Sequence, residues 1–224
     1  MNILIACEFS GVVRDAFREL GHNAWSCDIL PCDGDKEYHI QGDVLELIKD
    51  GGRKAVPNAW SCDIGGWNLL IAHPPCTYLC NSGVSALKHD GSKHKKKSGA
   101  LYGIPRWEAM YDGCQFFNSL KNADIAMIAI ENPIPHRYAR GYIGRYTQVI
   151  QPWMFGHKES KATCLWLKGL PKLSETDNVK VEMSELQRKE SQKIHWMSPG
   201  PERAKKRSIT FTGIGKAMAE QWGR

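Results

Sequence analysis

Residues 2–11 read Asn-Ile-Leu-Ile-Ala-Cys-Glu-Phe-Ser-Gly, and this stretch decides the fold. Its apolar run, residues 2–7, is the pattern of a short strand buried on both faces, as in a parallel sheet. A Ser-Gly turn follows. Apolar residues then recur at helical spacing from Val12 to Leu20, and Gly21 ends the helix. A buried strand, a tight turn and an amphipathic helix together predict the first unit of an α/β fold.

The same alternation continues along the chain. Further buried strands are expected at 23–29, 67–72 and 125–130, and helices are expected from residue 43 and over 107–120. A loop is expected over 30–42 and a short surface helix over 183–193. We therefore predict an α/β fold with a mostly parallel sheet and helices on both faces. Ligands bind such sheets at the carboxyl ends of the strands, so candidate site residues should lie there.

Length and composition set the broad class. The chain has 224 residues, 42% of them hydrophobic, which suits a single domain over 1–224 and excludes wholesale disorder. No apolar run approaches the ~20 residues of a membrane span. The acidic Glu8 comes too early for a secretory signal, so we expect a cytoplasmic protein without membrane partners.

The eight cysteines are spread through the chain rather than grouped. Without a secretion signal this favours free thiols in a reducing compartment over a disulfide framework. Cys76 and Cys80 are four apart, but no second ligand pair follows at zinc-finger spacing, so we expect no metal site.

Chemistry-bearing residues follow several predicted strands. They fall in four segments, which the topology should bring to one edge of the sheet: residues 7–11, Asp28 with Gly42-Asp43, residues 73–76 and residues 131–133. A thiol, carboxylates and a small-residue turn at one edge would form a plausible catalytic crevice. Taken alone, Asp28 and Asp43 are also typical turn or helix-cap residues.

Cys76 is the candidate nucleophile. The preceding Pro74 and Pro75 fix the backbone as it leaves a buried strand, so they hold the next side chain rigidly. A free thiol has a pKa of ~8.5, so a neighbour must stabilise the thiolate before it can attack at neutral pH. The alternative is a structural cysteine after a turn.

Glu131 is the residue that favours the catalytic interpretation. It ends the apolar run Ile-Ala-Met-Ile-Ala-Ile, where a carboxylate is costly unless it is paired or protonated. We expect burial to raise the pKa of Glu131 and leave a protonated carboxyl that donates to a ring nitrogen. The alternative is a structural ion pair with a nearby Arg or Lys.

With these residues in place, the sequence resembles the DNA cytosine-5 methyltransferase family. The resemblance rests on Phe9-Ser10-Gly11, Pro74-Pro75-Cys76, Glu131-Asn132, the segment 155–163 and the segment 212–218, in family order. It implies a Rossmann-like class I methyltransferase fold, S-adenosyl-L-methionine as cofactor, and transfer to cytosine C5 through a covalent Cys76 adduct. Glu131 would stabilise the charge at N3 of the base.

The resemblance also implies binding roles. The implied cofactor-binding residues are Glu8, Phe9, Ser10, Gly11, Asp28, Asp43, Pro74 and Gly213. The implied substrate-binding residues are Asn132, Lys161, Lys95 and Lys96. The family's first-motif acid would fall on Cys7, whereas this chain has Glu8 next to it, so Glu8 can take that role only if the strand end twists or bulges.

Two segments bear on the substrate. Residues 77–105 follow Cys76 and contain a lysine run over 93–97, which we interpret as a basic catalytic-loop insertion that contacts nucleic-acid phosphates. The alternative is a solvated charge run. Residues 173–207 are polar and take the place of the large target-recognition domain typical of the family. They are either a reduced DNA reader or a solvated connector.

The preferred function is therefore a DNA cytosine-5 methyltransferase-like enzyme with DNA as partner. The alternatives are the same chemistry on nucleotides or RNA, or a catalytically inactive DNA-binding protein with this fold. A nicotinamide-dependent oxidoreductase is disfavoured because the glycine-rich phosphate loop is missing. A short recognition segment leaves room for a homodimer or a separate specificity partner.

Overall fold

A seven-stranded sheet organises the computed structural model, which describes residues 1–49, 66–88, 100–197 and 201–224. Its strands are β1 (Asn2–Ala6), β2 (Asn23–Asp28), β3 (His39–Gln41), β4 (Leu69–Ala72), β5 (Met127–Pro133), β6 (Gln148–Ile150) and β7 (Thr163–Lys168). The helices are α1 (Val12–Glu19), α2 (Val44–Ile48), α3 (Ile104–Lys121), α4 (Arg137–Ile143), α5 (Lys180–Ser184), α6 (Lys193–Trp196), α7 (Pro201–Ser208) and α8 (Thr212–Trp222), with 3-10 turns η2 (Asn81–Leu87) and η3 (Pro152–Met154).

The strand order is β3-β2-β1-β4-β5-β7-β6. β1 to β5 pair in parallel, and β7 runs antiparallel to both β5 and β6. The order reverses between β1 and β4, which is the topological switch point where Rossmann-like folds bind their ligands. The predicted α/β, Rossmann-like fold with a mostly parallel sheet is confirmed.

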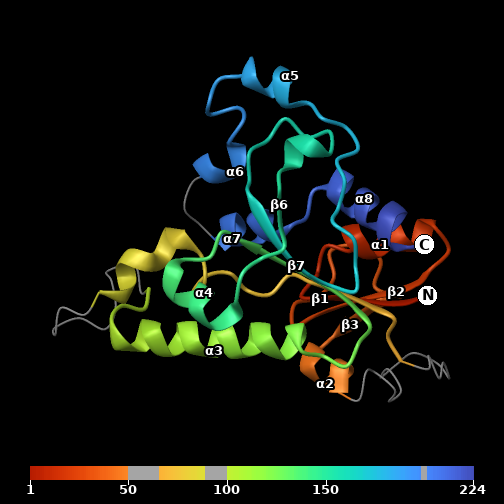
Figure 1. The fold of residues 1–224 in the computed structure, drawn as a ribbon, viewed down its shortest axis with the longest axis horizontal. Helices are drawn as coiled ribbons and strands as arrows, with labels where there is room; N and C mark the ends of the chain where they lie inside the picture. Colours follow the sequence, from red (N-terminus) through yellow and green to blue (C-terminus); the bar gives the residue numbers. More distant parts are fainter. Residues whose placement is uncertain (50–65, 89–99, 198–200) are drawn as a thin grey trace.

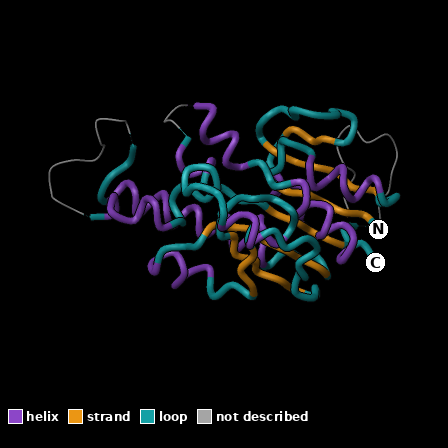
Figure 2. Tube along the Cα trace, turned by 90° about the horizontal axis from the view of Figure 1, so that it is seen from above, coloured by secondary structure: helices purple, strands orange, loops and turns teal. Residues whose placement is uncertain are grey.

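Helices cover both faces of the sheet, as predicted (Figures 1 and 2). On one face, Leu4 and Leu70 pack against Phe117 of α3. On the other, Ile71 packs with Phe17 of α1 and residues of α8. Successive strand residues point to opposite faces, so continuous apolar runs such as 3–6 supply both cores at once. Because these strands are buried on both faces, they hold the residues that follow their carboxyl ends in fixed positions.

Three elements differ from the sequence-based prediction. Residues His39–Gln41, expected within the loop 30–42, form β3 because they pair with the end of β2. β5 extends to Pro133 because β7 pairs with it as far as Thr163, so Glu131 lies inside the strand rather than beyond its end. The single helix expected over 183–193 is wrong. α5 ends at Ser184, residues 185–192 form turns and bends, and α6 begins at Lys193.

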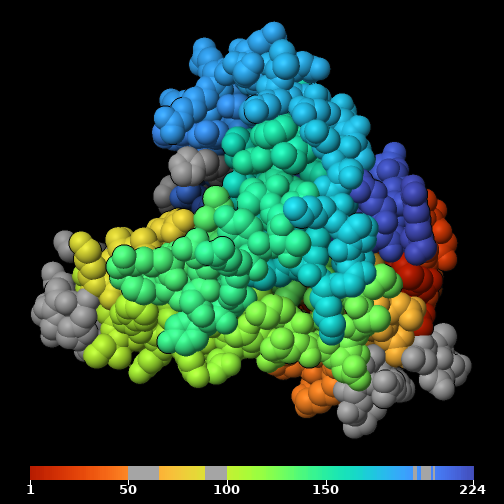
Figure 3. Space-filling model, viewed as in Figure 1, coloured from red at the N-terminus to blue at the C-terminus, as the bar shows by residue number. Residues whose placement is uncertain are grey.

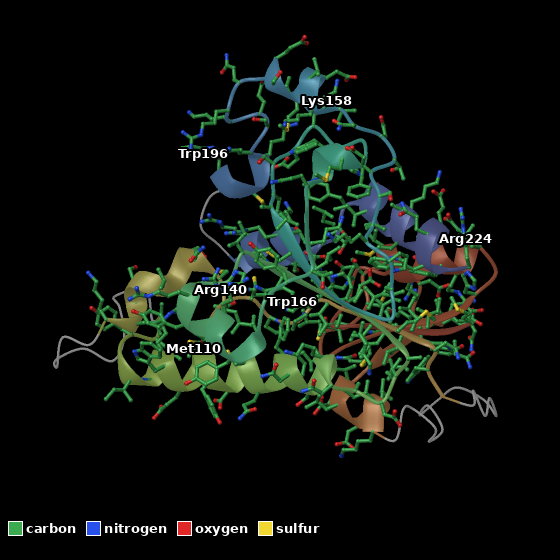
Figure 4. All side chains as sticks on the ribbon, viewed as in Figure 1. Met110, Arg140, Lys158, Trp166, Trp196 and Arg224 are labelled. Atoms are coloured by element: carbon green, nitrogen blue, oxygen red, sulfur yellow. The ribbon has the colours of Figure 1, made fainter. Side chains whose placement is uncertain are left out.

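A small lobe rises above the sheet and is built from residues 151–160 and 173–197 (Figures 1 and 3). Lys158 and Glu182 form an ion pair across it, with Nζ and Oε2 2.7 Å apart, and Lys158 is labelled near its top in Figure 4. The backbone N–H of Ser160 donates to the carbonyl of Ser191. Through these two contacts, part of the polar segment 173–207 packs against residues 151–160, which precede β7 in the chain.

No helix in the described ranges is both long and apolar enough to cross a membrane.

Candidate active site

The strand register brings the predicted residues into one row. Ala6 of β1 pairs with Cys27 of β2 and Ala72 of β4, and Ala72 pairs with Ile130 of β5. The next residue on each strand is therefore Cys7, Asp28, His73 or Glu131. The segments that begin at Cys7, His73 and Glu131 therefore start side by side at the carboxyl edge of the sheet, together with Asp28 of the remaining segment.

The turn after β1 is held by Glu8. Its Oε1 accepts from the N–H of Val13 at 2.7 Å, and its Oε2 accepts from the N–H of Arg14 at 3.2 Å, so the carboxylate satisfies the first turn of α1. Cys7 has a φ of 57°, a conformation rare for non-glycine residues. This is the twist that redirects Glu8. The carboxylate is buried and engaged with the helix, so its contribution to a cofactor site is to shape the Phe9-Ser10-Gly11 turn.

Gly11 closes that turn with a φ of 77°, which a side chain would strain. A Cβ there would also lie 2.5 Å from the guanidinium of Arg14. Phe9 is buried, and its carbonyl accepts from the N–H of Asp33 at 2.9 Å. Ser10 is half-buried, and its hydroxyl lies 3.4 Å from Glu8 Oε1. The small-residue turn is thus pre-shaped.

Asp28 ends β2 and Asp43 follows β3, both on the β1 side of the switch point. Asp28 accepts from the N–H of Leu30 and Asp43 from the N–H of Leu45, both at 2.9 Å, so each has the turn or cap role that the sequence left open. Burial and then these two carboxylates raise the pKa of Cys7, which places them around the end of β1. The neighbouring Ile29 is 75% exposed. Acids beside an exposed apolar side chain form a surface suited to a ribose and a purine ring.

The segment that carries Cys76 is tightly turned. Pro74 is buried, and the carbonyl of Cys76 accepts from the N–H groups of Leu79 and Cys80 at 3.0 and 3.1 Å. Arg106 at the start of α3 donates to the carbonyl of Thr77 at 3.0 Å. The thiol itself is half-buried at the edge of the sheet.

Cys76 and Cys80 share a proton. Their hydrogen bond, followed by burial, raises the pKa of Cys76, while Lys161 and Arg207 oppose that rise. The same bond, with help from the hydroxyl of Ser82 3.0 Å away, lowers the pKa of Cys80 to about 5. The Cys80 thiol is therefore the more acidic of the two, and it is the group beside Cys76 that can exchange a proton with it.

Replacing Cys80 with alanine should make Cys76 more reactive. At neutral pH we expect iodoacetamide to label Cys76, located by its fragment ions, about tenfold faster than in the wild type, because the hydrogen bond with Cys80 that raises the pKa of Cys76 is lost. Mass spectrometry of the labelled peptide measures this. Cys114→Ala, which removes a buried thiol on α3, serves as the control. Equal labelling of wild type and Cys80→Ala would contradict the shared proton.

Glu131 is paired, not protonated. Its Oε2 lies 3.0 Å from Nδ1 of His73, and the side chains are only 13% and 9% exposed. Burial by itself would raise the pKa of Glu131, but His73 and Lys161 lower it below its usual range. The expected protonated carboxyl is therefore wrong. The alternative ion pair is present, with His73 in place of Arg or Lys.

The segment after Glu131 locks onto the nucleophile segment. His136 Nε2 lies 3.0 Å from the carbonyl of Tyr78, and its Nδ1 accepts from the N–H of Ala139. The N–H of Asn81 donates to the carbonyl of Ile134. Asn132 is buried, and its Oδ1 has no hydrogen-bond partner within the described part of the chain. These contacts fix the two segments as one body.

Lys161 lies near all of the reactive groups. Its charge acts on Cys76, His73 and Glu131, and its Nζ donates to the carbonyl of Arg207 at 2.9 Å. The predicted substrate residue is thus brought together with both predicted catalytic residues. Nearby, Lys205 of α7 pairs with Asp33 at 2.6 Å and lies over the ring of Phe9.

Gly213 is not part of this cluster, and two further predicted positions fall outside the described residues. The N–H of Gly213 donates to His157 at 2.9 Å, and a Cβ there would lie 2.0 Å from the carbonyl of Phe155, so this glycine permits close packing of α8. Lys95 and Lys96 lie outside the described residues, as does most of the 77–105 segment after residue 88.

Sequence reasoning missed the roles of His73, Cys80 and His136. His73 directly precedes the Pro-Pro pair, and His136 follows Ile134-Pro135, so a histidine beside a proline turn at a strand end was the available signal. No comparable signal distinguished Cys80, because its role depends on the turn that brings it back to Cys76.

Comparison with known proteins gives limited help. No protein-family model matches the chain, and no curated protein matches it. One solved structure that it resembles is a prophage-encoded E. coli chain assigned provisionally as a DNA modification methyltransferase, with 14% identity and a TM-score of 0.42. The match covers 84% of this chain and 56% of that one. The chain thus spans little more than half the length of that protein.

Proposed function

We propose that the chain is an S-adenosyl-L-methionine-dependent methyltransferase that acts on cytosine C5 in DNA. The observation that carries this proposal is the pairing of β4 with β5, which sets His73, three residues before Cys76, beside Glu131, with Nδ1 and Oε2 3.0 Å apart. A thiol and a carboxyl group thus belong to neighbouring strand ends, those of β4 and β5, at the carboxyl edge of a Rossmann-like sheet. Such sheets bind their ligands at this edge.

The residues present fit the cofactor. Asp28 and Asp43 offer carboxylates for ribose hydroxyls and for a cationic group, and the exposed side chains of Ile29 and Leu30 offer an apolar surface for a purine. The Phe9-Ser10-Gly11 turn lies at the end of the adjacent β1. When bound, S-adenosyl-L-methionine supplies an electrophilic methyl group.

The chain's own residues would act on the base. The Cys76 thiolate adds to C6, which makes C5 nucleophilic, and Glu131 holds the ring nitrogen N3. After methylation, C5 loses its proton to water, the electrons of that C–H bond form the C5–C6 double bond, and Cys76 leaves as a thiolate. In duplex DNA the base must first leave the stack, at a cost of a few kcal/mol.

Positive charge supports a nucleic-acid substrate. The chain carries a formal net charge of +6, and α7 places Lys205, Lys206 and Arg207 on a helix beside the site. Cations that contact phosphates make binding strongly salt-dependent.

Incubation with labelled S-adenosyl-L-methionine tests the proposal. Duplex DNA, single-stranded DNA, RNA and free nucleotides are offered separately, and DNA containing 5-fluorocytosine then traps the adduct on Cys76. We expect label on cytosine in DNA. Transfer only to RNA or nucleotides would redirect the substrate assignment. DNA binding without transfer to any substrate would favour a non-enzymatic binding protein.

Replacing Asp43 with asparagine separates its two roles. Asparagine caps a helix as well as aspartate does, so α2 and the melting temperature should be unchanged. The lost charge should weaken S-adenosyl-L-methionine binding about tenfold, as measured by calorimetry. Asp43→Ala should lower both the melting temperature and the affinity for S-adenosyl-L-methionine. An unchanged affinity in Asp43→Asn would show that Asp43 does not bind the cofactor.

A further inference from the structure

His73 has no role in the chemistry proposed above, yet it lies beside Glu131. Its Nδ1 is 3.0 Å from Glu131 Oε2, and its Nε2 is buried with no hydrogen-bond partner among the described residues. A buried ring nitrogen without a hydrogen-bond partner costs free energy of folding. A functional use of the imidazole proton would explain why His73 is placed here.

Three charged groups face His73. Glu131 approaches from β5, Glu8 from the turn after β1, and Lys161 from the segment before β7. Burial by itself would lower the pKa of His73, but the two carboxylates outweigh Lys161 and raise it overall. The raised pKa of His73 and the lowered pKa of Glu131 together favour an imidazolium paired with a carboxylate.

This arrangement conflicts with what the base requires. As the bond from Cys76 to C6 forms, negative charge develops toward N3, and a donor must supply a proton there. An ionised Glu131 can only accept. His73 Nδ1, 3.0 Å from Glu131 Oε2, is placed to supply that proton.

We propose that His73 stores the proton that reaches the base through Glu131. This role rests on the proposed function. As the sulfur–C6 bond forms, the Nδ1 proton moves to the Glu131 carboxylate, and the resulting carboxyl gives it to N3, which leaves His73 neutral. When C5 has lost its proton and the sulfur–C6 bond breaks, N3 returns its proton through Glu131 to His73. His73 does not touch the base, so it is a positioning residue that also holds a proton.

His73→Asn tests this role. Its amide N–H can still donate to Glu131, as Nδ1 does, but it has no proton to transfer. Single-turnover methyl transfer to duplex DNA is measured for both proteins from about pH 5 to about pH 9. We expect an approximately hundredfold loss near pH 8. The loss should shrink at low pH, where Glu131 binds a proton itself. An equal loss at every pH, or no loss, would overturn the proposal.

A matched control and a second readout complete the test. His136→Asn removes another buried histidine at this edge while keeping a good helix cap, and it should not change the shape of the pH profile. Imidazole ¹⁵N shifts should report a charged His73 in the wild type at pH 7 and a neutral one in Glu131→Gln. A neutral His73 in the wild type would overturn the proposal. A wild type that methylates none of the substrates overturns the proposed function and this role with it, whereas an active wild type with an unchanged His73→Asn profile overturns this role alone.

Discussion

Replacing Cys76 with alanine should abolish methyl transfer and leave S-adenosyl-L-methionine binding intact. The thiolate forms the only bond between protein and base in the proposed reaction, so nothing else in the described site can activate C5. Cys76 is half-buried and lies in a turn held by backbone hydrogen bonds, which the substitution does not remove. The fold should therefore survive. Transfer is measured with labelled cofactor, and binding by calorimetry.

Two further variants sharpen this result. Cys76→Ser keeps the size and a hydroxyl but ionises far less readily, and it should be as inactive as alanine. Cys114→Ala removes a thiol buried on α3, away from the strand ends, and controls for the loss of a cysteine. Full activity in Cys76→Ala would rule out the covalent mechanism.

Replacing Glu131 with glutamine should have the second largest effect. The amide still donates a hydrogen bond, but it cannot transfer a proton, so we expect methyl transfer to fall about 10²- to 10⁴-fold. Single-turnover rates on duplex DNA measure this. Substrate affinity should change much less than the rate, and a variant with a weakened affinity but a normal rate would contradict a role in proton transfer.

Glu131→Gln should also change how the stability of the fold depends on pH, because it removes the carboxylate that pairs with His73. The pKa of Glu131 is lowered, so its contribution is present above its unfolded value and is lost as pH falls through the folded value. The pKa of His73 is raised, so its contribution is present below its unfolded value and is lost as pH rises through the folded value. The pair should therefore stabilise most between roughly pH 4.3 and pH 6.5. Melting temperatures of wild type and Glu131→Gln should differ most in this window.

Much of the fold was predictable because it depends on short apolar runs. The run at residues 2–7 specified a two-sided buried strand, and parallel pairing then fixed where its end would lie. Cys76, Glu131 and Asp28 could be assigned to one edge for this reason. The end of β5 was not predictable, because its extension to Pro133 depends on pairing with the distant β7.

The ionisation of the site was harder to predict than its location. Burial of Glu131 was expected from its apolar neighbours, but its partner His73 is 58 residues away in the sequence. Whether a buried carboxyl is charged depends on what the fold places beside it. Cys80 presents the same difficulty at short range, since only the turn at Cys76 brings the two thiols together.

The backbone contacts between residues 78–81 and 134–136 limit how this protein can diverge. A residue inserted into either segment would shift the register of the other, because Asn81 pairs with Ile134 and Tyr78 with His136. Such a shift would separate the nucleophile from Glu131. Relatives that keep the chemistry should therefore tolerate substitutions here more readily than changes in length, and alignment gaps should fall elsewhere.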